Sequence, residues 1–208
     1  MAIRIPAAPA RSIAALRAAL PSVATRAALA RVAPRLAASL TAGKAASMAP
    51  ALSYQVYTLG LSDLAAANGN DLKAAAKPSL WRHVLVSDGE AITADTSIDR
   101  TGAHHRFAAL NLNPAAAAVP STIEALEQDR KIADASYEAS LLQIPALGVR
   151  AVWLHDPTAV SPDILVPVPP VRSDLVAERR YSVAEFVGAL KHAALKILAD
   201  DDPRKGAT

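Results

Sequence analysis

The sequence predicts an α+β fold: a mainly antiparallel sheet of about five strands with helices on one face, preceded by an amphipathic helical N-terminal arm. Three observations favour this fold. Short apolar runs separated by turn residues recur between residues 80 and 168. A helix-periodic apolar stripe covers residues 183–198, and a separate, acid-free stripe covers the first 40 residues. Hairpin-like strands followed by helices are typical of antiparallel α+β layers.

Composition excludes several classes of protein. The chain has 208 residues, 52% of them hydrophobic and 4% aromatic, and it has no cysteine. Without cysteine it cannot form a disulfide scaffold, a zinc ribbon, a thiol nucleophile or an iron–sulfur cluster. The apolar content is sufficient for folding. Alanine supplies 49 residues, however, so each apolar residue buries less surface than the percentage suggests.

The net charge of +3 conceals a division along the chain. Residues 1–62 hold seven cations and no acid, which leaves 15 cations and 19 acids, or −4, for residues 63–208. Such asymmetry suggests that the two parts have different partners or are partners of each other. We therefore divide the chain into a basic arm (1–49), an α+β body (50–203) and a short tail (204–208). The pI of about 9.3 reflects the arm.

The arm carries two apolar stripes at helical spacing. They are Ile13, Leu16, Leu20 and Val23, followed by Leu29, Val32, Leu36 and Leu40. Pro21 and Pro34 lack the amide hydrogen that a helix interior needs, so we expect breaks there. Because alanine is the commonest of the remaining residues, the stripe is thin and needs a covering surface. The body, another copy, a partner protein and a lipid surface all remain open.

The first part of the body gives a mixed signal and then a clear hairpin. Alternation at Leu52, Tyr54 and Val56 favours a strand, whereas residues 61–72 suit short helices. Strands over 81–86 and 91–94 flank Asp88-Gly89, a dipeptide that favours the positive φ angles of a hairpin turn. A third strand is expected over 105–112.

The second part of the body predicts a helix, two strands and a final helix. Ser121 and Glu124 have the spacing of a capping box, which predicts that a helix opens there. Strands follow over 149–155 and 164–168. Pro167, Pro169 and Pro170 cannot donate to a strand ladder, so we expect the second to be an edge strand or the exit from one. Ser182 and Glu185 form another capping box before the last helix, with Tyr181 placed to pack on Phe186.

Most motif-based chemistry is missing from the sequence. It contains no Walker loop, no G-x-G-x-x-G, no G-x-S-x-G, no H-E-x-x-H and no EF-hand loop. We therefore predict no cofactor and no metal site. His104 and His105 are adjacent, and neighbours on a strand point to opposite faces, so the two cannot readily share one metal ion.

Three residues are weak candidates for a catalytic or binding pocket. His83 lies within a predicted strand, while His155 and Asp156 lie at the end of another. If those strands were adjacent, the three could form a base with an orienting carboxylate, or part of a metal site. The alternative function is therefore a small-molecule-binding protein or a hydrolytic enzyme with a histidine/aspartate pocket beside the sheet.

The charge division favours a non-catalytic interaction or assembly protein, although an enzyme stays open. Its basic arm would dock on an acidic protein partner or on a neighbouring copy. The residues expected to form that interface are Arg17, Arg26, Arg31, Arg35, Leu16, Leu20, Leu29, Val32, Leu36 and Leu40. Nucleic-acid binding is not expected, because no aromatic residue or glycine is interleaved with the arginines to stack on bases. Peripheral membrane contact is a further alternative.

The sequence indicates a cytoplasmic protein. Recurring arginines interrupt any secretory h-region, and no stretch of about 20 apolar residues predicts a membrane span. Residues 1–49 nevertheless have the composition of an organellar transit segment, rich in arginine and free of acids. An organellar matrix protein is therefore the alternative.

Overall fold

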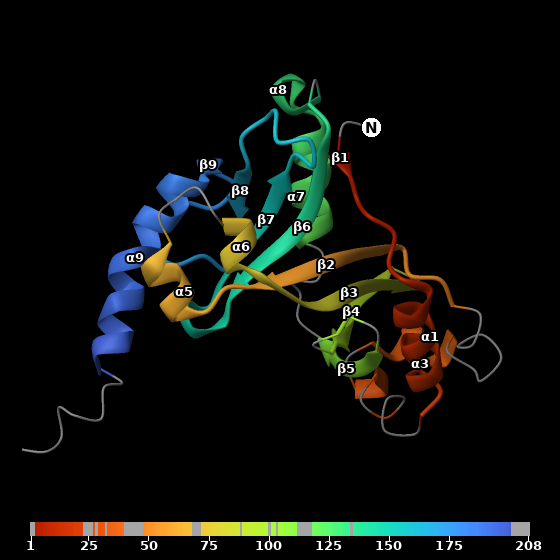
Figure 1. Ribbon diagram of the computed structural model, residues 1–208. Helices are drawn as coiled ribbons and strands as arrows, with labels where there is room; N and C mark the ends of the chain where they lie inside the picture. Colours follow the sequence, from red (N-terminus) through yellow and green to blue (C-terminus); the bar gives the residue numbers. More distant parts are fainter. Residues whose placement is uncertain are drawn as a thin grey trace, which may run out of the picture.

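The computed structural model describes residues 3–22, 27, 29–31, 33–39, 48–67, 72–87, 89–99, 101–102, 104–111, 118–133 and 135–200. Within these residues nine strands form one mixed, mostly antiparallel sheet, and seven α-helices pack on it (Figure 1). The fold class is therefore α+β, as predicted. The sheet has nine strands rather than about five.

The elements have the following bounds. The strands are β1 (Ile3–Arg4), β2 (Leu52–Thr58), β3 (Lys77–Ser87), β4 (Glu90–Ile98), β5 (His105–Asn111), β6 (Tyr137–Ile144), β7 (Val149–His155), β8 (Ile164–Pro167) and β9 (Tyr181–Ser182). The helices are α1 (Ala10–Ala19), α3 (Pro34–Ser39), α5 (Leu61–Ala66), α6 (Leu72–Ala75), α7 (Ala118–Glu127), α8 (Arg130–Ala133) and α9 (Val183–Asp200). A 3-10 turn, η2 (Pro145–Leu147), joins β6 to β7.

The strand order is β5-β4-β3-β2-β6-β7-β8-β9, and β1 pairs with β6 outside this path. The β2–β6 and β1–β6 pairs are parallel, and the other neighbours are antiparallel. β2 pairs with β6 only where residues 56–58 face residues 141–143; further along, β1 pairs with β6 at Tyr137 and Glu138. An outer half (β3–β5) and an inner half (β6–β9) therefore meet at a short junction (Figure 1).

Helices lie on both faces of the sheet, so the prediction of helices on one face is wrong. Alternation places His83 and Leu85 of β3 on one face and Val84 on the other. Leu85 packs with the arm, whereas Val84 packs with residues of α7. α5, α6 and α9 form a core with Trp153 of β7, while Val152 of β7 packs on the α7 side. The inner strands are buried on both sides, as strands between two helical layers are.

The arm packs on the outer half of its own sheet. Leu16, Leu20 and Leu36 are fully buried in a cluster that includes Leu85 and Ile92. Of the predicted stripes, Ile13 and Leu16 lie on α1 and Leu36 lies on α3, whereas Val23, Val32 and Leu40 lie outside the described residues. The apolar stripe, which could have been covered by several surfaces, is covered by the body.

Local chemistry explains which element boundaries were predicted. β3 and β4 pair up to Ser87 and Glu90, and Gly89 between them has a φ of 79°, so the predicted hairpin is confirmed. The final capping box is also confirmed, because Ser182 N donates to Glu185 Oε2 at 2.8 Å and Glu185 N donates to Ser182 Oγ at 3.3 Å. Tyr181 and Phe186 pack edge to face at 6.2 Å.

In the second part of the body, the start of α7 and one of two alternatives for β8 were predicted wrongly, and one strand was missed. The capping box at Ser121 does not open α7, which begins at Ala118, so Ser121 lies inside the helix. β8 is not an edge strand, because β9 pairs with it on the outer side. The alternative, that the prolines mark the exit from a strand, is confirmed, because Pro167 is the last residue of β8 and Pro169 and Pro170 follow it. The central strand β6 was missed, because it is buried on both faces and its residues, YEASLLQI, lack clear alternation.

Replacement of Leu16 by alanine tests the packing of the arm. Leu16 is fully buried, so Leu16→Ala should lower the free energy of unfolding by about 2–5 kcal/mol through lost burial and a residual cavity. Urea denaturation measures this loss. Leu195, which is 50% exposed on α9, is the control, and Leu195→Ala should change stability by less than about 0.5 kcal/mol. Equal effects of the two substitutions would mean that the arm does not pack on the sheet.

Candidate functional site

The structure does not bring the three candidate residues into one site. His83 lies on β3, whereas His155 ends β7 and Asp156 follows it. β2 and β6 lie between β3 and β7 in the sheet. Three interstrand spacings of about 4.8 Å place the two histidines about 14 Å apart, beyond hydrogen-bond reach. The hypothesis of a shared His83, His155 and Asp156 site is therefore wrong, because the strands that carry the histidines are not adjacent.

His83 forms part of a buried hydroxyl cluster that ties the arm to the sheet. Its Nε2 lies 2.9 Å from Ser12 Oγ of α1 and 3.2 Å from Thr96 Oγ1 of β4. Its Nδ1 lies 2.9 Å from Ser53 Oγ of β2. Burial lowers the pKa of His83 to about 4, although the nearby Asp95 carboxylate opposes this change. The ring is therefore neutral near pH 7 and can donate from one nitrogen and accept at the other.

The Ser12–His83 contact has the spacing of a nucleophile and its base, but its surroundings favour a structural role. Both side chains are fully buried, so a substrate cannot reach them in this conformation. The other nitrogen of His83 contacts a serine hydroxyl, where a catalytic triad has a carboxylate. The cluster therefore satisfies buried polar groups and fixes the position of α1.

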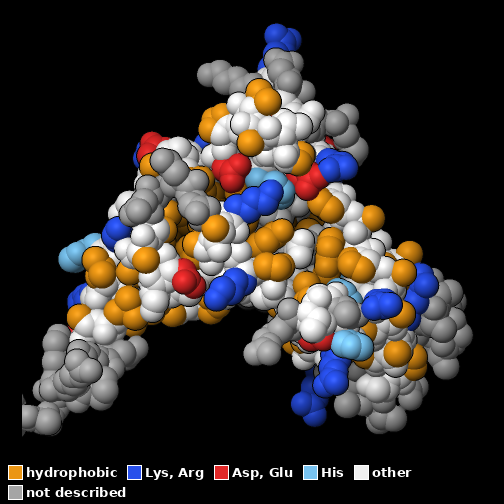
Figure 2. All heavy atoms as spheres, viewed as in Figure 1, with side chains coloured by type: hydrophobic (Ala, Val, Ile, Leu, Met, Phe, Trp, Pro, Cys, Tyr) orange, Lys and Arg blue, Asp and Glu red, His pale blue; other side chains and the backbone are white. Residues whose placement is uncertain are grey.

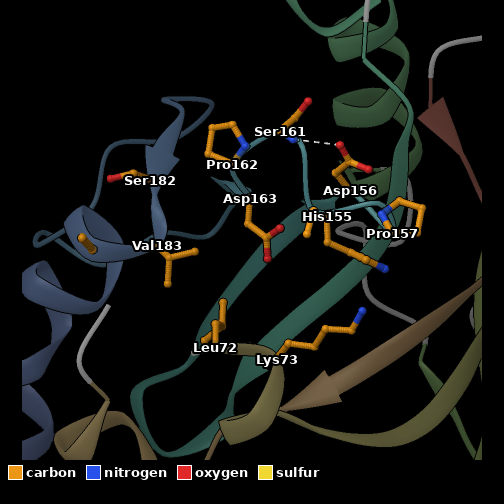
Figure 3. Close-up of a pocket in the computed structure, with 12 residues that line it drawn as sticks. Leu72, Lys73, His155, Asp156, Pro157, Ser161, Pro162, Asp163, Ser182 and Val183 are labelled. Carbon is orange, nitrogen blue, oxygen red and sulfur yellow. Dashed lines mark hydrogen bonds between the residues drawn. The ribbon is translucent and has the colours of Figure 1, made fainter. Parts of the chain in front are cut away.

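His155 and Asp156 line a cavity of about 390 Å³ at the end of β7. Its walls come from α6, from the loop between β7 and β8, and from the start of α9 (Figure 3). Its polar and charged lining residues include Lys73, His155, Asp156, Asp163 and Ser182. In Figure 2, basic, acidic and histidine side chains lie beside one another near the end of β7. We call this space the β7 cavity.

Asp156 organises the loop that forms one wall of the β7 cavity. Its Oδ1 accepts hydrogen bonds from Thr158 N at 2.8 Å and Thr158 Oγ1 at 2.6 Å, and its Oδ2 accepts one from Ser161 N at 2.8 Å. These bonds lower the pKa of Asp156 to about 2. Figure 3 shows the carboxylate directed toward Ser161. Asp156 therefore shapes the loop and does not orient His155.

His155 is held in the wall as a neutral ring. Its Nε2 lies 3.4 Å from Glu138 Oε2, and Glu138 also forms an ion pair with Arg4. Burial, followed by the positive charge of Lys73, lowers the pKa of His155. Its Nδ1 is buried and has no hydrogen-bond partner. A general base needs a nitrogen that its substrate can reach. In His155, Nδ1 is buried and Nε2 faces Glu138, so a substrate in the cavity can reach neither nitrogen.

Lys73 and Asp163 bring opposite charges into the β7 cavity. Lys73 extends from α6, and Asp163 extends from the segment before β8 (Figure 3). The indole Nε1 of Trp153 donates to Asp163 Oδ2 at 2.8 Å and so fixes the carboxylate. Sequence reasoning missed both residues. They are separated by 90 positions and lie in no motif, so only the fold places them in one cavity.

Of the residues predicted to form the arm interface, the described leucines are buried, the described arginines lie at the surface or bond within the chain, and three residues are not described. Leu16, Leu20, Leu29 and Leu36 are fully buried within the chain, so they are not available to a partner in this structure. Arg31 and Arg35 are exposed, and Arg17 Nε donates to Met48 O at 3.0 Å. The other members of the predicted interface, Arg26, Val32 and Leu40, lie outside the described residues.

Neither a metal centre nor a membrane-spanning helix is found in the part of the chain that the structure describes. No three histidine or acidic side chains there are grouped so that they could hold a metal ion. None of the helices there has both the length and the apolar character needed to cross a bilayer.

The pKa of His83 predicts how stability depends on pH. Between pH 6.5 and about 4 the unfolded chain protonates this side chain and the folded chain does not, so stability should fall as the pH is lowered through this window. The pKa difference corresponds to a loss of up to about 3 kcal/mol. Urea denaturation at pH 7 and pH 4.5 measures it. His83→Gln should show a smaller dependence, to which His155 still contributes; an equal dependence in both proteins would contradict the assignment.

Comparison of the chain with protein-family models, with curated proteins and with solved structures found no match. No relative therefore suggests a substrate or a partner. The function has to be inferred from the residues that the fold brings together, and the β7 cavity is where charged groups from separate segments meet.

Proposed function

We propose that this protein binds a small polar molecule in the β7 cavity. The observation that carries the proposal is the convergence of Lys73 and Asp163 on one cavity of about 390 Å³. Ligand pockets have volumes of about 300–1,000 Å³, with mainly apolar walls and a few placed polar groups. Leu72, Val183 and the prolines of the loop supply such walls here.

The same geometry favours binding over hydrolysis. A hydrolytic site needs an accessible base and a nucleophile within its reach. In the β7 cavity, His155 Nδ1 is buried and Nε2 faces Glu138, while Ser182 Oγ donates to Glu185 at 2.8 Å. The carboxylate of Asp156 accepts hydrogen bonds from its own loop. The polar groups that remain open to a ligand are therefore suited to recognition.

Substitutions in the cavity test this proposal. A panel of polar metabolites, comprising amino acids, organic acids, amines and sugars, is screened by ¹⁵N NMR. We expect at least one class to shift the amides of residues 155–163 and 182–184, and Lys73→Ala or Asp163→Asn to weaken that binding about tenfold, or about 1.4 kcal/mol. Lys196→Ala, at an exposed lysine of α9, is the charge-matched control. Absence of any binding, or equal effects of Lys73→Ala and Lys196→Ala, would contradict the proposal.

A second candidate function is assembly between copies through the outer face of the arm. With the leucines buried, Arg31 and Arg35 are exposed on that face. A groove of about 370 Å³ lies between α7 and the sheet, and Glu124 and Glu127 are its only charged lining residues in the described part of the chain. The basic arm of one copy is therefore complementary in charge to the groove of another. Charge complementarity of this kind steers association and is weakened by salt.

A charge exchange tests the assembly. Arg31→Glu and Glu124→Lys should each lower the mass measured by sedimentation at low ionic strength, and the double variant should recover part of it. Lys196→Glu, on α9, should have no such effect. High salt should dissociate the wild-type assembly. A wild-type protein that is monomeric at both ionic strengths would rule out this candidate.

A further inference from the structure

The charged groups of the β7 cavity indicate which chemical class of ligand it accepts. Lys73 and Asp163 extend into the cavity from different walls (Figure 3). No ion pair within 4.0 Å joins either residue to the other or to another described residue. One cation and one anion thus line the same cavity without contacting each other, and in Figure 3 the ammonium end of Lys73 lies toward His155.

The carboxylate of Asp163 is fixed before a ligand arrives. Trp153, whose indole donates to it, is 1% exposed and packs edge to face on Tyr57 with ring centroids 5.2 Å apart. The position of the acceptor is therefore set by a rigid core residue. A group held in place in this way loses little conformational freedom on binding, which favours a specific ligand contact.

The other titratable groups of the cavity leave few polar atoms open to a ligand. Asp156 is ionised, but three hydrogen bonds from its own loop satisfy its carboxylate. Burial and the charge of Lys73 lower the pKa of His155, so the ring is neutral near pH 7. The groups available to a ligand are thus one ammonium and one carboxylate.

We infer that the β7 cavity binds a small zwitterion of the α-amino-acid type, whose carboxylate contacts Lys73 and whose ammonium contacts Asp163. The apolar wall at Leu72 and Val183 receives the side chain of the ligand. The volume of about 390 Å³ is at the small end of the range for ligand pockets, which suits a single amino acid better than a nucleotide. This inference rests on the proposed binding function.

Isothermal titration of the full chain with each common L-amino acid tests the inference. For the tightest binder, the matched probes are its deaminated acid and its decarboxylated amine. We expect the zwitterion to bind about tenfold more tightly than either probe. In Lys73→Ala, which lacks the partner of the ligand carboxylate, the amine should bind as tightly as the zwitterion. In Asp163→Asn, which lacks the partner of the ligand ammonium, the acid should bind as tightly as the zwitterion. Lys73→Arg should retain the preference, because it keeps the cation.

The outcomes separate this inference from the function on which it rests. If no amino acid binds but an organic acid, an amine or a sugar does, the cavity is a ligand site and the zwitterion is wrong. If an amino acid binds but its deaminated acid and its decarboxylated amine both bind as tightly as it does, the assignment of a zwitterion is also wrong. If nothing in the whole panel binds, both the inference and the proposed function fail. Unchanged ¹⁵N spectra away from the cavity show that the variants are folded.

Discussion

Burial of the arm against β3, β4 and β5 is the interaction on which the outer half of the sheet depends. That half has α1 and α3 on the face that carries Leu85 and Ile92. Few large side chains fill the interface, because 19 of the 49 arm residues are alanine. The hydroxyl cluster around His83 adds directional bonds to this thin apolar contact. A buried imidazole is costly when its nitrogens lack partners, and three hydroxyls supply them here. The arm is thus positioned both by apolar packing and by buried hydrogen bonds.

The inner half has a different organisation and bears the candidate ligand site. β6 and β7 are covered by α9 with α5 and α6 on one face and by α7 on the other, so they form a rigid support. The β7 cavity lies where β7 leaves that support and the loop fixed by Asp156 begins. Binding groups are often carried on loops held by such a scaffold. The arginines of the arm belong to the outer half, so the two candidate functions use different parts of the chain.

The sequence allowed prediction of the elements whose boundaries are set by local chemistry. The hairpin around Gly89 and the cap formed by Ser182 and Glu185 depend on neighbouring residues and could be read directly. β6 could not, because a strand buried on both faces loses the alternation that marks a half-buried strand. The residues of the candidate site were even harder to predict from the sequence. Ser12 and His83 are 71 positions apart, and Lys73 and Asp163 are 90 apart, so only the packing of helices and loops on the sheet brings each pair together.

The leucines of the arm are covered by the sheet of their own chain. Methyl NOEs between the arm leucines Leu16 and Leu20 and the sheet residues Leu85 and Ile92 test this packing most directly. In uniformly labelled protein these NOEs should be present. In a mixture of labelled and unlabelled chains, an isotope-filtered experiment that detects only contacts between molecules should show none. NOEs that appear in the filtered experiment would mean that the arm packs on another copy, and NOEs missing from both experiments would mean that the arm does not pack on the sheet.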